Sequence, residues 1–389
     1  MAKAGIYFDN AASTRVDPRV VAAMLPYFEE FYGNASSLHI FGEQAREALE
    51  NSRQKLAALL GAKAEELVFT SGGTESNNFA LKGIAYANRG QGRHLIVSQI
   101  EHDCILESCR WLAKEGFEIT YLPVDGEGLI DLQSLANSIR KDTILVSIMH
   151  ANNEIGTIEP IEEIGKICRD HQVYFHTDAC QSFGKIPIDL KDIDLMTINS
   201  HKIYGPKGVG ALFIREGVKI APWQHGGGHE GGRRSSTENL PGIVGFVKAA
   251  ELCLEEIEKE RKRLAALRDR VIAQALANME TAYLNGPREK RLPNNVNLGF
   301  HGREADAVGL LLKLNDFGIA VSTGSACSSN RKSSHVLKAI GLNPIESLGA
   351  LRITLGRFNT EEEVDYFLEV LPQALGSTRS VWSRGEKNG

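Results

Sequence analysis

The chain has 389 residues, of which 42% are hydrophobic and 24% charged, and its net charge of -5 argues against nucleic acid or an anionic membrane as the main partner. This length favours two domains, no apolar run approaches the roughly 20 residues of a membrane span, and the N-terminus lacks the apolar core of a signal peptide. Six cysteines without a CxxC pair or regular spacing are typical of a reducing compartment, so we expect a cytoplasmic protein.

Helices and strands alternate between about residues 43 and 215. An amphipathic segment, GEQAREALENSRQKLAALLG, opens this region, and short apolar segments bounded by polar residues recur after it. Alternation of this kind predicts an α/β domain whose mainly parallel sheet is flanked by helices. The expected strands are residues 66–70, 94–99, 143–149, 173–179, 194–200 and 210–215.

The last third of the chain follows a different pattern. A long helical stretch from 240 to 277 links it to the first region, and its charged residues form the solvated side. Thr360 and Glu363 offer a capping box for a final helix. We predict a large domain at 14–256 and a smaller α+β domain at 1–13 and 257–389. The elements expected in between are 294–300, 304–315, 319–323, 335–341 and 351–356.

The cysteines divide by their surroundings. Cys109, Cys168 and Cys253 fall on the apolar faces of expected helices, where a thiol is a small buried hydrophobe. Cys104 and Cys180 lie beside polar motifs, and their role is open. Cys327 stands in STGSACSSN, among small and polar residues with no apolar periodicity, so it is a candidate for a reactive thiol on a loop.

Polar residues gather where expected strands end, which is where ligands of parallel sheets bind. Lys202 follows one such strand and Asp178 ends another, and neighbouring strands lie about 4.8 Å apart. A lysine able to form a Schiff base and a carboxylate for a pyridine nitrogen are the two main protein contacts of pyridoxal 5'-phosphate. This pair predicts a site for that cofactor.

Two further motifs support the cofactor site. TSGGTESNN, residues 70–78, leads from a strand into a helix whose first N–H groups suit a phosphate. His102 ends another strand and could stack on the cofactor or move protons. His225 and His229 are four residues apart, but glycines separate them, so we predict an anion-friendly loop at 225–239 and no metal site.

Six ordered motifs, SHKIYGPKG, TSGGTESNN, HTDACQS, HGGGHEGGRRSSTEN, MHANNEIGT and STGSAC, resemble those of the pyridoxal-phosphate cysteine desulfurases. The short cysteine loop is similar to that of group I, which serves iron–sulfur and nitrogen-fixation assembly. The resemblance runs from residue 7 to about residue 367. It implies a fold type I homodimer of the class V aminotransferase superfamily, with L-cysteine as substrate and a protein sulfur acceptor, such as an iron–sulfur scaffold, as partner.

The resemblance also implies roles for individual residues. Lys202 would hold the cofactor as a Schiff base, and Arg352 would bind the substrate carboxylate, helped by Asn153. Cys327, as a thiolate, would take the substrate sulfur as a persulfide while the carbon skeleton leaves as alanine. The remaining cofactor contacts would be Asp178 to the ring nitrogen, Gln181 to the ring hydroxyl, His102 on the ring, and Gly73, Thr74, Asn199, Ser200, His201 and the partner's Thr237 around the phosphate.

The chain departs from the family pattern in places. The stretch after Cys327 is one residue shorter than usual, which puts the reach of the loop and the choice of acceptor in doubt, and Asn199 stands where serine is usual. A selenocysteine lyase or an aminotransferase of the same fold is the alternative enzyme, and an idle scaffold or thiol protein is the alternative from another class. A transaminase would survive Cys327→Ala, and a scaffold would stay colourless. The sulfur acceptor, the rates and the preference between cysteine and selenocysteine stay open.

Overall fold

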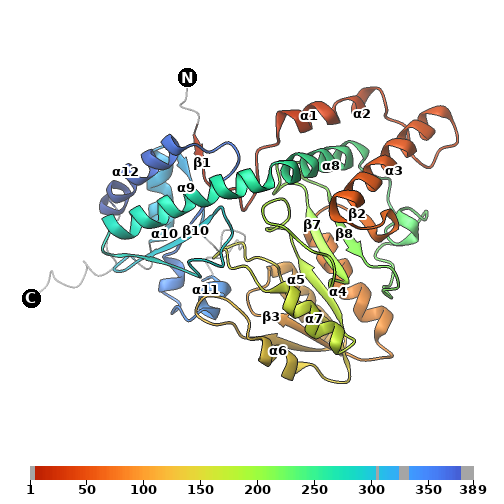
Figure 1. Ribbon diagram of the computed structural model, residues 1–389, viewed down its shortest axis with the longest axis horizontal. Helices are drawn as coiled ribbons and strands as arrows, with labels where there is room; N and C mark the ends of the chain where they lie inside the picture. The colour runs from red at the N-terminus through yellow and green to blue at the C-terminus, as the bar shows by residue number, and fades with distance from the viewer. Residues whose placement is uncertain (1–4, 304–305, 324–332, 378–389) are drawn as a thin grey trace, which may run out of the picture.

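The computed structural model describes residues 5–303, 306–323 and 333–377 (Figure 1). Its centre is a seven-stranded sheet in the order β2-β8-β7-β6-β5-β3-β4. The pairs among β3 to β7 are parallel, whereas β8 is antiparallel to β2 and β7, so the predicted mainly parallel sheet is confirmed. The strands are β2 Leu67–Thr70, β3 His94–Ser98, β4 Glu118–Leu122, β5 Thr143–Ser147, β6 Tyr174–Asp178, β7 Leu195–Asn199 and β8 Gly210–Ile214.

Both faces of this sheet are buried under apolar clusters. Successive side chains of a strand point to opposite sides, so neighbours along a strand belong to different clusters. Ile96 and Met196 pack into one apolar cluster, and their neighbours Leu95 and Leu195 pack into another. This explains why the central strands read as continuous apolar runs. The first cluster includes α3 Ile40–Leu60, α6 Leu132–Ser138, α7 Ile161–Asp170 and α8 Leu240–Glu255, and the second includes α4 Gly73–Asn88 and α5 Asp103–Lys114.

The last third of the chain builds a separate apolar cluster, to which the N-terminal Phe8 also belongs. Phe8 meets Phe367 edge to face, with ring centroids 5.8 Å apart. This packing is the kind that a domain of 1–13 and 257–389 requires, and the proposed boundaries stay a prediction. The elements are β1 Ile6–Tyr7 paired with β11 Ile319–Ala320, the sheet β12 Leu351–Thr354, β10 Asn295–Phe300 and β9 Ala282–Leu284, and the helices α9 Ile257–Asn278, α10 Ala307–Asp316, α11 His335–Ala339 and α12 Glu361–Ser377.

The helical stretch expected at 240–277 is two helices, because the chain turns at Glu256 (φ -102°, ψ 4°) between α8 and α9 (Figure 1). The capping box is confirmed: the N–H groups of Thr360 and Glu363 each bond to the other's side chain at 3.3 Å. Cys109, Cys168 and Cys253 are buried, as predicted.

Two short helices, α1 Pro18–Met24 and α2 Pro26–Glu29, lead from the N-terminal segment to α3. Asp17 caps α1 by accepting from the Arg19 N–H, and Pro18 occupies the first helical position, where its missing N–H costs nothing. Over the described ranges, no helix combines the length and the apolar character that crossing a membrane requires.

Candidate active site at the carboxyl edge of the sheet

A cavity of about 430 Å³ opens at the carboxyl edge of the parallel strands. It also reaches Arg352 on β12 and the N-terminal residues Ala11 to Ser13, so both parts of the chain contribute walls. The predicted site residues that line it are Gly73, Thr74, His102, Asn153, Asp178, Asn199, His201, Lys202 and Arg352.

Lys202 and Asp178 reach the cavity from neighbouring strands, as the sequence predicts. Asp178 is the last residue of β6 and pairs with Thr197 of β7, and Lys202 follows the end of β7. The Asp178 carboxylate accepts from Asn77 Nδ2 at 2.6 Å and from the Cys180 N–H at 2.9 Å. Burial would raise the pKa of Asp178, but the Cys180 hydrogen bond, the charge of Lys202 and the Asn77 hydrogen bond hold it below the ordinary value. The buried carboxylate is therefore ionised.

The glycine turn before α4 forms a second wall. A Cβ at Gly73 would lie 2.6 Å from Cys180 Sγ, so only glycine lets the start of α4 approach the turn after Asp178. The helix start is also acidic: Glu75 Oε2 accepts from the Ser71 N–H at 2.6 Å and pairs with Arg234. The first turn of α4 thus presents amide N–H donors, and the charge of Glu75 in that turn is neutralised by Arg234.

Side chains at the end of β7 leave polar atoms for a ligand. Within the described part of the chain, Asn199 Oδ1 and Ser200 Oγ are buried without a hydrogen-bond partner, although Ser200 does not line the cavity. Burial, then Lys202 and Lys207, lower the pKa of His201 to about 4. Its imidazole is neutral at pH 7, and the positive charge on this wall comes from the two lysines.

His102 lies at the start of α5, where its Nδ1 accepts from the Cys104 N–H at 3.2 Å. Burial and the charge of Lys202 lower the pKa of His102, so the ring is neutral. Cys104 and Cys180, whose role was open, both line the cavity. Burial raises the pKa of Cys104 to about 12 and that of Cys180 well above its usual value, so neither thiol is an effective nucleophile.

Arg352 is held at the far wall by two oxygen atoms. Its Nη1 donates to the carbonyl oxygen of Asn153 at 3.2 Å, and its Nη2 donates to Asp9 Oδ1 at 2.9 Å. The Arg352–Asn153 association is therefore seen, through the main chain of Asn153. Asp9, two residues after β1, was not predicted.

Besides Ser200, two predicted residues lie away from the cavity wall. Gln181 is buried behind it and donates from Nε2 to the carbonyl oxygen of Ala11 at 3.0 Å. Thr237 is exposed and does not line the cavity of its own chain. Cys327 lies outside the described residues. Among the residues that are described, no three His, Cys, Asp or Glu side chains are grouped closely enough to hold a metal ion.

Asn77 and Lys207 were also not predicted. Asn77 stands one turn after Gly73 in the quoted TSGGTESNN, so helical spacing alone places it on the side of α4 that faces Asp178. Lys207 follows in SHKIYGPKG, and it returns to the cavity because the chain reverses between the antiparallel strands β7 and β8.

Comparison with known proteins identifies the family. The profile of aminotransferase class-V matches residues 6–367. Cysteine desulfurase IscS of Dictyoglomus turgidum is 51% identical over 97% of this chain and 96% of its own, and that of Methanosarcina thermophila is 52% identical over 97% and 93%. A solved structure of a NifS-like protein superposes with a TM-score of 0.90 at 41% identity, covering 96% of this chain and 99% of that one. The chain belongs to the class-V aminotransferases and, within them, to the cysteine desulfurases.

Proposed function

We propose that the chain transfers the sulfur of L-cysteine to its own Cys327, giving L-alanine and an enzyme persulfide, with pyridoxal 5'-phosphate as cofactor. In this step the S–S bond forms as the C–S bond breaks, and the substrate carbon gains a proton. The observation that carries the proposal is the meeting of Lys202 and Asp178 at neighbouring strand ends in one cavity. A protein sulfur acceptor, such as an iron–sulfur scaffold, would then take the sulfur from Cys327.

The described residues fit the cofactor. An ionised Asp178 suits a pyridine nitrogen. Asn199 lines the cavity, and its buried Oδ1, which has no partner among the described residues, is an atom that a polar ligand or water would satisfy. The glycine turn before α4 leaves space and amide donors for a phosphate. When bound, the cofactor supplies an electron sink that loosens the carbon–sulfur bond.

The chain's own residues have distinct tasks around the cofactor. Lys202 would hold the cofactor through its amine, and the same nitrogen would carry protons when it is free. The neutral His102 ring covers the site and accepts or donates a proton at Nε2, because Nδ1 faces the N–H of Cys104. Arg352 binds the substrate carboxylate, and Asp9 and Asn153 hold its guanidinium in place before substrate arrives.

Incubation with L-cysteine tests the proposal directly. After digestion without reductant, we expect the peptide that contains Cys327 to gain the mass of one sulfur atom. The Cys327→Ser protein should show no gain and should still bind the cofactor, since this loop thiol is not a proposed cofactor contact. Sulfur on another cysteine, or cofactor-loaded wild-type protein that makes alanine without any persulfide, would contradict the assignment.

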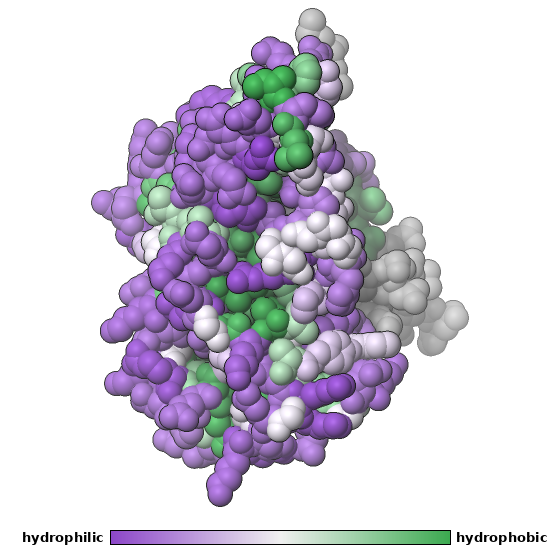
Figure 2. Space-filling view, turned by 90° about the vertical axis from the view of Figure 1, so that its right-hand side faces the viewer, coloured by the Kyte–Doolittle hydropathy of each residue, from purple (hydrophilic) through white to green (hydrophobic). Residues whose placement is uncertain are grey.

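A surface on α1, α2 and the start of α3 supports a homodimer. Several large apolar side chains are exposed there, whereas monomers rarely expose large apolar patches. Figure 2 looks at the side of the molecule where these helices lie and shows green side chains within a mostly polar surface. Ser36 Oγ lies 3.5 Å from His229 Nε2, so the patch adjoins the loop that carries Thr237. The patch consists of Val21, Leu25, Phe28, Tyr32, Leu38, Ile40 and Phe41.

We expect the double variant Phe28→Glu, Leu38→Glu to be monomeric in sedimentation equilibrium, because two charges on each copy would have to lose their water. These side chains are 60% and 96% exposed in the single chain, so folding should persist. Val308→Glu, at an exposed apolar position on α10 outside the patch, is the matched control and should remain dimeric. A double variant that stays dimeric would place the interface elsewhere.

A further inference from the structure

Tyr204, two residues after Lys202, has a conformation that is rare for an aromatic residue. Its φ of +67° lies in the left-handed region, where a Cβ meets the backbone. Strain of this kind persists only where the surroundings impose it, and it is concentrated at functional sites. The residue next to it, Gly205, would be the easier place for such a turn.

Three hydrogen bonds bind Tyr204 to parts of the chain far away in sequence. Its N–H donates to Thr14 Oγ1 at 2.8 Å, and its carbonyl oxygen accepts from the Asp17 N–H at 2.9 Å. Its hydroxyl oxygen accepts from the Arg357 N–H at 2.7 Å, and the Arg357 guanidinium lies over the ring, 4.8 Å from its centroid. The backbone of Tyr204 is thus fixed by the N-terminal segment, and its side chain by the residues after β12.

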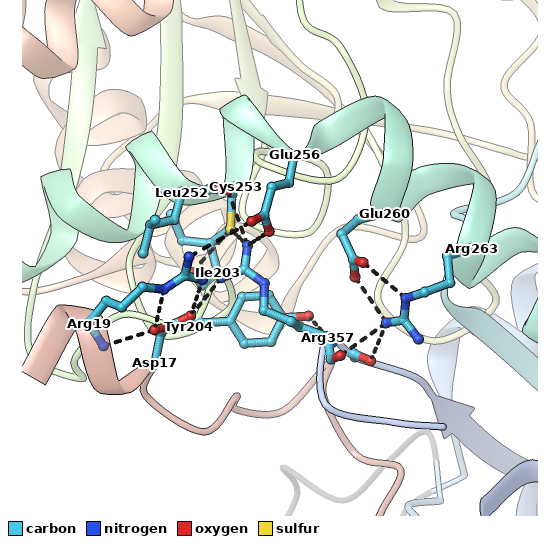
Figure 3. Close-up of polar contacts among 11 residues, drawn as sticks. Asp17, Arg19, Ile203, Tyr204, Leu252, Cys253, Glu256, Glu260, Arg263 and Arg357 are labelled. Atoms are coloured by element: carbon cyan, nitrogen blue, oxygen red, sulfur yellow. Dashed lines mark hydrogen bonds and ion pairs between the residues drawn. The ribbon is translucent and has the colours of Figure 1, made fainter. Parts of the chain in front are cut away.

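Arg357 is itself held in a buried network, drawn in Figure 3. Its guanidinium bonds to Asp17 at 2.9 Å, to the carbonyl oxygen of Leu252 at 3.2 Å and to Glu256 at 3.2 Å, where α8 gives way to α9. Arg263 of α9 donates to the carbonyl oxygens of residues 356, 357 and 359. Segment 356–359 therefore has a fixed position against both helices.

This network connects the part of the site that carries Lys202 with the part that carries Arg352. Thr14 binds the carbonyl oxygen of His201 through its N–H and its hydroxyl, at 2.8 and 2.9 Å, directly before Lys202. On the other side, Arg352 lies on β12, and Arg357 lies five residues later, just beyond the end of that strand. Tyr204 belongs to the lysine turn and bonds directly to the segment after β12 through its hydroxyl, and Asp17 contacts both through its N–H and its carboxylate.

We propose that Tyr204 is a positioning residue: it fixes Lys202 relative to Arg352 by joining the turn after β7 to segment 356–359. This rests on the proposed function, in which cofactor and substrate carboxylate are held by those two residues at once. Its parts have separate tasks. The ring and the left-handed backbone set the lysine turn, and the hydroxyl sets the distance to β12.

The test compares Tyr204→Phe, Tyr204→Gly and Tyr204→Ala with wild-type protein. Tyr204→Phe retains the ring and loses only the hydroxyl link to Arg357, so we expect unchanged pyridoxal 5'-phosphate affinity of the apo-protein and weaker binding of L-alanine to the loaded protein. Tyr204→Gly and Tyr204→Ala should weaken both by about tenfold or more, since small displacements of reacting groups have effects on that scale. Both dissociation constants come from absorbance titrations. Glycine relieves the strain, so a loss there assigns the effect to the side chain.

Tyr86→Ala is the control, because Tyr86 is partly exposed and lies about 20 Å along α4 from Gly73. A lower melting temperature with both dissociation constants unchanged in all three Tyr204 variants would overturn the proposal, since it indicates a structural role alone.

Hydrogen exchange of the apo-protein tests the link without the cofactor. Tyr204→Phe should speed exchange at residues 351–358 alone, whereas Tyr204→Ala should speed it at both 200–205 and 351–358, and β3 should be unaffected in either variant. Tyr204→Ala that speeds exchange at one segment only would overturn the proposal. Wild-type protein that takes up no pyridoxal 5'-phosphate would refute the proposed function instead, and the exchange result would still decide whether the two segments are coupled.

Discussion

Lys202→Ala is expected to lower sulfide release from L-cysteine by on the order of a thousandfold or more, the scale on which enzymes lose a covalent catalytic group. The variant should also lose pyridoxal 5'-phosphate on dialysis, because the amine that tethers the cofactor is gone. Lys202 lines the cavity and belongs to none of the apolar clusters, so the apo-protein should melt close to the wild-type temperature. Absorbance of the dialysed protein and a sulfide assay measure the two effects.

Lys219→Ala is the matched control for this variant. Lys219 is exposed just beyond β8 and does not line the cavity, so cofactor retention and sulfide release should be those of wild-type protein. Borohydride reduction followed by peptide mapping identifies the tether in wild-type protein. Reduced cofactor attached to Lys207 or Lys185 would show that the wrong lysine has been assigned.

Asp178→Asn is expected to weaken pyridoxal 5'-phosphate binding by about ten- to a hundredfold, because a charge-assisted hydrogen bond of roughly 1.5–3 kcal/mol is lost. The neutral side chain has a second disadvantage. Both oxygens of Asp178 accept, one from Asn77 and one from the Cys180 N–H, whereas an asparagine offers only one acceptor. One buried donor then has no partner, so the melting temperature should fall as well. Fluorescence titration of the apo-protein measures the affinity.

The pKa of Asp178 lies below the ordinary value, so the wild-type carboxylate stays ionised from neutral pH down into mildly acidic conditions. The affinity advantage of wild-type protein over Asp178→Asn should therefore persist at pH 6 and shrink only when the pH falls through that lowered pKa. Asp170→Asn, at the exposed end of α7, provides the control. Equal cofactor affinity in Asp178→Asn and wild-type protein would remove Asp178 from the ring nitrogen.

The parts of the fold that were predicted are those with two buried faces. Central strands such as β5 and β7 are buried along their whole length, and their mainly apolar sequences, TILVS and LMTIN, reveal them. The edge strand β4, Glu118–Leu122, was not predicted, because it is only partly buried and its sequence EITYL is mixed. The break at Glu256 was also not predicted. No glycine or proline marks it, and Glu256 contacts Arg357, about a hundred residues away in sequence.

The site divides in the same way. Residues at or just beyond strand ends, such as Asp178 and Lys202, could be placed from the sequence because parallel strands end at one edge of the sheet. Asp9 could not, since its role depends on β1 joining β11 and on Arg352 reaching it from β12. Strain at Tyr204 leaves no mark in the sequence, because the residues that impose it come from both ends of the chain.

The bond between Asp9 and Arg352 spans 343 residues, and Phe8 is part of the C-terminal apolar cluster. During synthesis, Phe8 and Asp9 therefore find these partners only after β12 has left the ribosome. The central sheet can form earlier, but its cavity then lacks a wall. We therefore expect a nascent chain to have no complete place for its substrate until β12 has emerged.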